Sequence, residues 1–185
     1  MRIIAGSLKG RRLTSPSDES IRPTSDRTRE SIFNLLMHGY YGGESIIDQH
    51  VLDICCGTGA LGLEAISRGA ARVTFVDTSK KSIALARDNA LHCGVSSKCH
   101  FIQIDARQLG RNPHEPAALM LIDAPYDAPL LKPIYAQIVK GHWLRPGSIV
   151  LAELPFTQQP PELEGTKYLE MRKYGKATVH LWEVE

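Results

Sequence analysis

The feature that most constrains the fold is a regular alternation of apolar runs and helical patterns between residues 50 and 154. The strand-like runs are HVLDIC, ARVTFVD, CHFIQID, ALMLID and GSIVLAEL. Helical patterns separate most of them, in the segments GALGLEAISRG, SKKSIALARDNALHCG and APLLKPIYAQIVKG. Strands that alternate with helical segments form parallel sheets with helices on both faces. The sequence therefore predicts a doubly wound α/β fold.

The N-terminal part precedes this alternation and differs from it. The runs RIIAG and GRRLTS flank a turn at residues 7–10, which is typical of a small β-hairpin. The capping candidates Thr24, Ser25 and Asp26 then introduce apolar residues at helical spacing. We therefore expect a helix over about 26–38.

The C-terminal part also departs from the alternation. The tail TKYLEMRKYGKATVHLWEV reads as two strands joined at Tyr174 and Gly175, an antiparallel hairpin at the sheet edge. With this hairpin, the sheet would be seven-stranded and mostly parallel. We therefore divide the chain into an N-terminal hairpin and basic arm over 1–25 and a single domain over 26–185.

Composition excludes several classes of protein. Hydrophobic residues make up 43% and charged residues 23% of the 185 residues, an ordinary globular balance. No apolar run approaches the roughly 18 to 20 residues of a membrane helix, and the N-terminus lacks the apolar stretch of a secretory signal. The four cysteines form no C-x-x-C pair, which argues against zinc and fits a reducing compartment. We expect a cytoplasmic protein with no metal and no membrane partner.

The positive charge is concentrated near the N-terminus. The net charge is only +2, yet residues 1–29 contain seven Lys or Arg against three acids. A basic arm on a slightly acidic body would suit a polyanion such as nucleic acid, and a solvated basic surface would show the same composition.

The first candidate site is the turn in VLDICCGTGALGLEA, between the first strand and its helix. Gly57, Gly59 and Gly62 have the spacing G-x-G-x-x-G, which lets the backbone approach a ligand closely. Ligands of open α/β sheets bind beyond the carboxyl ends of the strands. The turn alone fits a nicotinamide dinucleotide as well as S-adenosylmethionine.

Acids at successive strand ends discriminate between these two ligands. Asp53 lies four residues before the first glycine, where a carboxylate would repel a pyrophosphate and suit an ammonium group. Asp77 can accept hydrogen bonds from ribose hydroxyls, and Asp105 can accept from an adenine amino group. The series favours S-adenosylmethionine. The residues expected to bind it are Asp53, Cys56, Gly57, Thr58, Gly59, Asp77, Asp105 and Ala106.

The second candidate site is the segment DAPY at the end of the fourth strand. An amine on a base is a poor nucleophile, because its lone pair is delocalised into the ring. Two acceptors, the Asp123 carboxylate and the Ala124 carbonyl, would hold both N–H groups and direct the lone pair at an activated methyl group. Pro125 aims the Ala124 carbonyl, and Tyr126 offers a ring face to an unpaired or flipped base. The other interpretation is a strand that ends in a proline turn, with Tyr126 in the core.

These motifs resemble the RsmD family of 16S ribosomal RNA guanine-N2 methyltransferases, within the class I methyltransferase superfamily. The resemblance covers MRIIAGSLKGRRL, RPTSDRTRESIFNLL, ALGLEAISRGA and the late R-x-YG at Arg172, Tyr174 and Gly175. DAPY resembles the motif Asp-Pro-Pro-Tyr, with Ala124 in place of the first proline, and CCGTG stands where FAGSG is usual.

The resemblance implies a Rossmann-like fold and a chemical reaction. It implies S-adenosylmethionine as the methyl donor and S-adenosylhomocysteine as the product. It further implies methyl transfer to the N2 of one guanine in 16S rRNA, in the small ribosomal subunit or its assembly intermediate.

Basic residues of the N-terminal part are the candidates for contact with this RNA. They are Lys9, Arg11, Arg12, Arg22, Arg27 and Arg29. The last three flank a helix start, where backbone N–H groups favour an anion, either an RNA phosphate or the cofactor carboxylate. The first three lie on the expected hairpin and could reach further along the RNA backbone.

Three other interpretations remain open. A DNA amino-methyltransferase acting on adenine N6 or cytosine N4 would share the DAPY segment, although no block of spare residues supplies a target-recognition region. A nicotinamide-dependent oxidoreductase would share the glycine turn. A non-catalytic RNA-binding protein would keep the fold. From the sequence we expect a monomeric, cytoplasmic rRNA methyltransferase.

Overall fold

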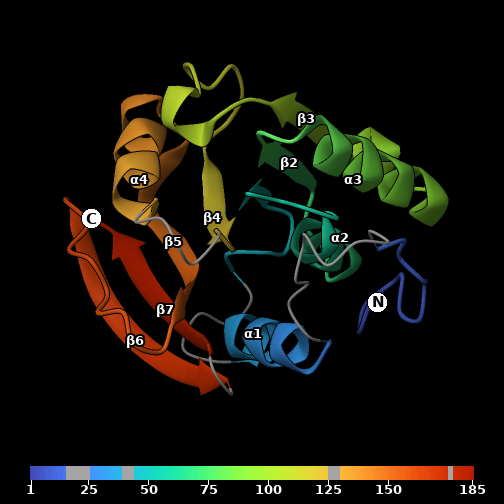
Figure 1. The fold of residues 1–185 in the computed structure, drawn as a ribbon, viewed down its shortest axis with the longest axis horizontal. Coiled ribbons are helices and arrows are strands. Elements are labelled where there is room, and N and C mark those ends of the chain that lie inside the picture. The colour runs from blue at the N-terminus through green and yellow to red at the C-terminus, as the bar shows by residue number, and fades with distance from the viewer. Residues whose placement is uncertain (16–25, 39–43, 125–129, 175–176) are drawn as a thin grey trace.

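The computed structural model describes residues 1–15, 26–38, 44–124, 130–174 and 177–185, arranged around one mixed sheet (Figure 1). The strands follow the order β3-β2-β1-β4-β5-β7-β6. Strands β1 to β5 pair in parallel, and β7 runs antiparallel to both β5 and β6. Their bounds are β1 His50–Ile54, β2 Arg72–Asp77, β3 Cys99–Gln103, β4 Ala117–Ile122, β5 Leu144–Pro155, β6 Thr166–Tyr174 and β7 Ala177–Val184. The predicted seven-stranded, mostly parallel sheet with a C-terminal antiparallel hairpin is confirmed.

Helices cover both faces of this sheet, as the alternation predicts. Figure 1 shows α1 and α2 on one side of the strands and α4 on the other. The bounds are α1 Asp26–His38, α2 Ala60–Ser67, α3 Lys80–Cys93 and α4 Leu131–Lys140, with short 3-10 turns at η1 Ser96–Lys98 and η2 Ala106–Gln108. Within the described ranges, no helix is both long and apolar enough to cross a membrane.

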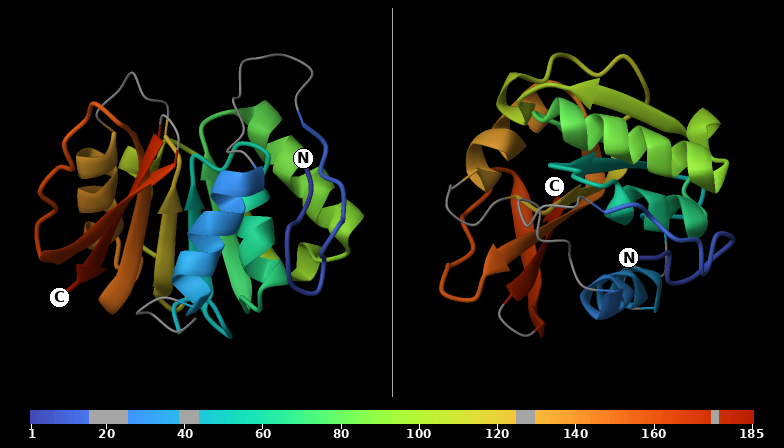
Figure 2. Two further views of the ribbon diagram at one scale, coloured as in Figure 1. Left: turned by 90° about the horizontal axis from the view of Figure 1, so that it is seen from below. Right: turned by 45° about the vertical axis from the view of Figure 1, so that its right-hand side comes forward.

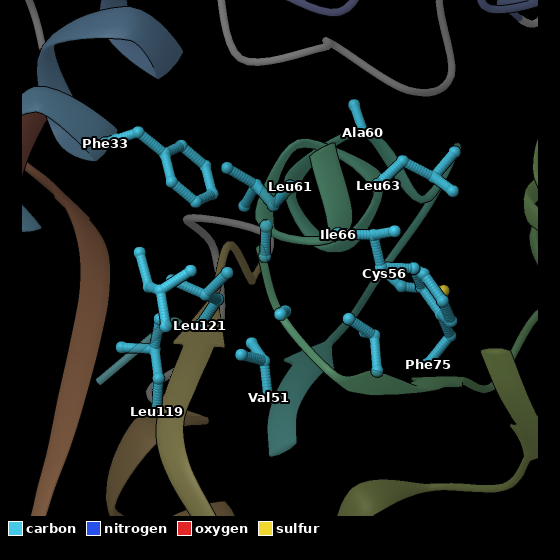
Figure 3. Close-up of a cluster of buried hydrophobic side chains, with 14 of the residues drawn as sticks. Phe33, Val51, Cys56, Ala60, Leu61, Leu63, Ile66, Phe75, Leu119 and Leu121 are labelled. Carbon is cyan, nitrogen blue, oxygen red and sulfur yellow. The ribbon is translucent and has the colours of Figure 1, made fainter. Parts of the chain in front are cut away.

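The core has two layers because the central strands are buried on both faces. All five residues of β1 are buried, which is typical of a parallel strand between two layers of helices. Val51 belongs to the layer under α1, α2 and α3, and Leu52 and Ile54 belong to the layer under α4. Figure 3 shows the first layer, where Phe33 of α1 and Leu61 of α2 lie on the side of Leu119 and Leu121 of β4.

The N-terminal hairpin is present and is shorter than the sequence suggests. One antiparallel bridge joins Arg2 to Arg12, and the Ile3 N–H donates to the Arg11 carbonyl at 2.9 Å. Ile3 and Leu13 are buried in the same apolar layer as α1 and α2. The arm therefore packs on the domain through its apolar side chains.

Candidate active site

The strand order brings the sequence-predicted acids to one edge of the sheet. β1 lies between β2 and β4, which are both parallel to it. The successive strands β1 to β3 extend to one side of β1, and β4 and β5 extend to the other, so the strand order switches at the β1–β4 pair. Asp53 lies near the end of β1, Asp77 ends β2, and Asp123 follows β4. In an open α/β sheet, this position beyond the carboxyl ends of the strands is where ligands bind.

Asp53 is the most deeply buried of these acids. Asp53 is only 1% exposed, and its Oδ2 accepts a 2.8 Å hydrogen bond from the Gly62 N–H. That N–H lies in the first turn of α2, where backbone donors have no partner inside the helix. Burial raises the pKa of the Asp53 carboxyl well above its usual range, and the charges of Asp123 and Asp77 raise it further. A positively charged ligand here would favour the ionised carboxylate.

The glycine turn is held in place by Asp77. The Gly57 N–H donates to Asp77 Oδ2 at 3.0 Å, and the Ser79 N–H donates to Asp77 Oδ1 at 2.8 Å. Cys55 and Gly57 both have positive φ angles, of 59° and 52°, so the backbone turns sharply at this point. Asp77 is half-buried and each of its oxygens keeps a further lone pair for a ligand.

Gly62 lets α2 approach the sheet closely enough for its N–H to reach Asp53. A Cβ at this position would lie 2.4 Å from Cε1 of Phe75 and 2.8 Å from Cγ1 of Val73, both on β2. A larger residue would push the helix away from the strand. The third glycine of the turn is therefore required by packing.

The thiol of Cys55 lies in a region that the charges of several acids influence. Burial raises its pKa to about 12, and Asp77, Asp53, Asp123 and Asp105 each add to the rise through their negative charge. The thiol is therefore protonated at neutral pH and is a poor nucleophile. The acids at this edge create a negative potential that suits a cationic ligand, and such a ligand would favour ionisation of Asp53.

Two other residues of the turn contribute their side chains to the protein interior. Cys56 is 7% exposed and belongs to the apolar layer under α2. Thr58 is 4% exposed, and its hydroxyl lies 3.9 Å from Sδ of Met1. Any contact of these two residues with a ligand would have to come from their backbone.

Asp105 differs from the other acids because it lies in an exposed ion pair. Its Oδ2 lies 2.6 Å from Nη2 of Arg107, and the same carboxylate accepts from the Arg107 N–H. These hydrogen bonds to Arg107 lower the pKa of Asp105. The next residue, Ala106, is buried, and it begins η2 against α4.

Asp123 and Ala124 lie half-buried directly after β4. Ile122 of β4 pairs with Ile54 of β1, so the chain leaves the sheet next to the glycine turn. The charge of Asp123 contributes to the raised pKa of Asp53, so the two carboxyls act on the same part of the site. Pro125 and Tyr126, the remainder of the second candidate site, lie outside the described residues.

The basic residues predicted to contact nucleic acid fall into two groups. Lys9, Arg11, Arg12 and Arg27 are exposed, and Arg22 lies outside the described residues. Arg29 is fully buried, so its side chain cannot reach RNA in this arrangement. We therefore remove Arg29 from the set of proposed RNA contacts.

Arg29 instead helps to anchor the N-terminal arm. Its Nη2 donates to the Arg2 carbonyl at 2.6 Å and to Asp26 Oδ1 at 2.8 Å, and its Nε lies 3.9 Å from Glu64 Oε2. Arg68 donates to the other Glu64 oxygen at 2.8 Å. Glu64 also accepts from the Ile4 and Ala5 N–H groups, at 2.8 and 3.1 Å.

Asn89 is a connecting residue that sequence reasoning missed. It is 1% exposed on α3, and its side chain makes hydrogen bonds to both the N–H and the carbonyl of Thr14, at 2.8 and 3.1 Å. The same amide donates to the Thr58 carbonyl at 3.0 Å. One buried side chain therefore joins the arm to the glycine turn. The available signal was a polar residue on the apolar face of a predicted helix.

No metal site accompanies these residues in the part of the chain that the structure describes. Among those residues, no three His, Cys, Asp or Glu side chains are grouped so that they could hold a metal ion.

The chain matches a family model and known proteins over nearly its full length. The family model described as "Conserved hypothetical protein 95" matches residues 1–183. The "Putative rRNA methyltransferase YlbH" of Bacillus subtilis is 30% identical over 190 residues, which cover 99% of this chain and 98% of that protein. The "Ribosomal RNA small subunit methyltransferase D" of Escherichia coli strain K12 is 27% identical over 186 residues, covering 100% and 90% of the two chains.

Solved structures show the same fold. The structure of the putative methyltransferase yhhF from Escherichia coli has a TM-score of 0.83 at 27% identity, and the match covers 100% of this chain and 98% of that one. An RNA methyltransferase from Salinibacter ruber, solved with S-adenosyl-L-homocysteine, has a TM-score of 0.66 at 16% identity over 88% and 94% of the chains. This second likeness concerns the fold alone.

Proposed function

We propose a specific reaction for this chain, which belongs to the family of RsmD-type methyltransferases described as "Conserved hypothetical protein 95". The reaction is the transfer of a methyl group from S-adenosylmethionine to the exocyclic N2 amine of a guanine in 16S rRNA. The substrate is the small ribosomal subunit or its assembly intermediate, and the protein acts in the cytoplasm, where ribosomes are.

The convergence of Asp53, Asp77 and Asp123 beside the glycine turn is the observation that carries this proposal. Asp53 and Asp123 raise the pKa of neighbouring groups, which reflects a negative potential at the ends of β1 and β4. S-adenosylmethionine has a sulfonium and an ammonium group that suit this potential, and it supplies an activated methyl group. The oxygens of Asp77 that hold Gly57 and Ser79 have lone pairs left for ribose hydroxyls.

The same geometry disfavours a nicotinamide dinucleotide. In dinucleotide-binding folds, the pyrophosphate lies on backbone N–H groups at the start of the first helix. Here the Gly62 N–H in the first turn of α2 donates to the Asp53 carboxyl at 2.8 Å, so this donor is not available to a phosphate. The site therefore does not support the alternative assignment as a nicotinamide-dependent oxidoreductase.

The end of β4 would position the amine that is methylated. The Asp123 carboxylate and the Ala124 carbonyl would accept from the two N–H groups of the amine and orient its lone pair. Pro125 and Tyr126 would aim the carbonyl and stack the base. Lys9, Arg11, Arg12, Arg22 and Arg27 are the proposed contacts to the RNA backbone. These contacts would position the substrate and supply most of the salt dependence of its binding.

Tritium transfer from labelled S-adenosylmethionine tests the reaction. Small subunits that lack the modification, naked 16S rRNA and DNA are compared as substrates, and the labelled nucleoside is identified by mass spectrometry. We expect label on guanine N2 of the rRNA. Label on DNA alone would contradict the proposal.

Variants at the two ends of the site test its residues. Asp123→Ala should lower the transfer rate by roughly 10²- to 10³-fold, since it removes one group that orients the amine. Asp88→Ala, which removes an exposed acid on α3, is the matched control. Asp77→Ala should weaken S-adenosylmethionine binding in calorimetry without any RNA. Full activity of Asp123→Ala would refute the assigned role.

A further inference from the structure

Exposed apolar side chains gather on and beside the C-terminal hairpin. Among the described residues, Phe156, Tyr168 and Met171 are 54%, 43% and 45% exposed. Phe156 directly follows β5, and the other two lie on β6. The other large exposed apolar residues, Ile47, Leu91 and Val139, are dispersed over separate parts of the chain. Phe156 is the most exposed of the three, and an exposed aromatic ring of this size is a candidate contact surface.

A cation accompanies the most exposed of these rings. The Nζ atom of Lys173 lies 3.8 Å from the centre of the Phe156 ring. Strand register explains the contact, because Lys173 pairs with Thr178 of β7, and Thr178 pairs with Leu154 of β5. Phe156 therefore lies two residues beyond the level of Lys173. The side chain of Lys173 is exposed, so its ammonium group can meet a second partner.

This ring and its cation lie on the same edge of the sheet as the candidate active site. Ile122 of β4 pairs with Ala152 of β5, so Asp123 is level with the next residue of β5. Phe156 follows three residues later, which is roughly 10 Å further along the strand direction. The strand that carries it is the immediate neighbour of β4. A nucleotide close to the modified one would reach this position.

We propose that Phe156 and Lys173 form a second contact for the RNA substrate, in which a nucleobase near the target guanine stacks on the Phe156 ring and the Lys173 ammonium pairs with a phosphate. The inference rests on the proposed RNA substrate and adds a contact outside the DAPY segment and the basic arm. Unpaired bases stack on aromatic side chains with little regard to sequence, and neighbouring cations neutralise the backbone.

The chemistry of the surface favours RNA over a protein partner. Lysine is depleted from the cores of protein–protein interfaces, whereas a lysine beside an exposed ring is the combination used to hold single strands. A protein partner would instead require the ring to be buried among other apolar groups.

Binding of a fluorescent 16S rRNA fragment measures the contact independently of methyl transfer. Phe156→Ala should weaken binding roughly 5- to 150-fold, the range for one stacked base. Phe156→Trp should preserve it. Lys173→Gln should make the plot of log affinity against log salt concentration less steep, by about the amount due to one phosphate contact. The matched controls are Leu91→Ala on α3, which is 70% exposed, and Lys98→Gln in η1. Neither control should change affinity for the fragment.

The outcomes separate this inference from the proposed reaction. Weakened binding by Phe156→Ala, with unchanged S-adenosylmethionine affinity in calorimetry, supports the contact whether or not transfer is detected. Equal binding by wild type and Phe156→Ala overturns the contact even if guanine is methylated. A loss of S-adenosylmethionine binding in Phe156→Ala would also overturn it, because the ring would then support the fold rather than the RNA.

Discussion

The N-terminal arm and the C-terminal hairpin are both antiparallel additions to a parallel sheet, and they are attached in different ways. Figure 2 shows them on opposite sides of the molecule. The arm is held mostly by side chains, because Glu64 and Ser67 of α2 bind the backbone of residues 4–8, and one backbone bond joins the Ser7 N–H to the Ser67 carbonyl at 2.8 Å. The hairpin is held by its backbone, because β7 pairs with β5 from Ala177 to Glu183.

The difference lies in what is buried under each region. Beneath the arm, Glu64 and Arg29 have fully buried side chains and Arg68 is 6% exposed. Beneath the hairpin, the buried residues are apolar, with Val179, Leu181 and Trp182 each at most 1% exposed. In addition to the buried Ile3 and Leu13, the arm therefore depends on a few polar groups that all need their partners, whereas the hairpin depends on apolar area and a continuous ladder.

Of the changes that test this difference between the arm and the hairpin, removal of Glu64 should destabilise the protein most. Glu64→Ala leaves Arg29 and Arg68 without their buried counter-charge and the Ile4 and Ala5 N–H groups without an acceptor. We expect a loss of about 3–5 kcal/mol in the free energy of unfolding, measured by urea denaturation. Limited proteolysis should cut within residues 1–13 before the domain unfolds.

An exposed ion pair in the hairpin supplies the control for this prediction. Glu170→Ala removes the contact with Arg172, whose side chain is 56% exposed. The cost should stay below about 1 kcal/mol. Equal effects of the Glu64 and Glu170 variants would show that burial does not distinguish the two regions.

Leu181→Ala tests the hairpin in the same way. Leu181 is fully buried in the layer shared by β5, β7 and α1, and the shortened side chain leaves a cavity. We expect a loss of about 3 kcal/mol in urea denaturation, with a single transition for the whole domain. Early cleavage of the arm in this variant would contradict the separation of the two attachments.

Asn89→Ala should break the link between the arm and the glycine turn. The change leaves the Thr58 carbonyl and both backbone groups of Thr14 without their buried partner. We expect a cost of about 1–3 kcal/mol in stability and a weaker affinity for S-adenosylmethionine in calorimetry. Asn89→Asp keeps the acceptor and loses the donors, so it should restore neither property. An unchanged cofactor affinity would limit Asn89 to holding the arm.

The hairpin should also respond to acid more than the arm, because it contains His180. Burial lowers the pKa of His180, whose ring lies 3.0 Å from the Tyr168 hydroxyl and 2.9 Å from the Thr178 hydroxyl. The unfolded chain binds a proton near pH 6.5 and the folded chain does so at lower pH. The stability from this residue is thus complete above about pH 6.5 and is lost as the pH falls, by at most about 1.4 kcal/mol per pH unit.

His180→Gln should flatten this dependence in urea titrations between pH 7.5 and pH 5. His50, whose pKa burial lowers to about 4, contributes a similar slope in both proteins, so the difference isolates His180. Identical pH profiles would show that His180 titrates alike in the folded and unfolded chains.

Much of the candidate site could be predicted from the chain. The glycine turn and the acids Asp53, Asp77 and Asp123 follow from the rule that parallel strands end at one edge of the sheet. The structure places all three there, and it gives Asp53 a partner, the Gly62 N–H, that spacing alone did not suggest. The roles of Pro125 and Tyr126 stay predictions, since these residues lie outside the described residues.

The sequence by itself determined the order of strands and helices, because hydrophobic periodicity and turn residues act over a few neighbouring positions. Only the tertiary structure decided which polar residues are buried and which partners they bind. Arg29 reads as a surface cation, and it is buried because Glu64 and the Arg2 carbonyl, far from it along the chain, close around it. The connection made by Asn89 likewise depends on Thr14, which is 75 residues away. The free energy of burying a charge or an amide depends on the partners present, and packing alone assembles those partners.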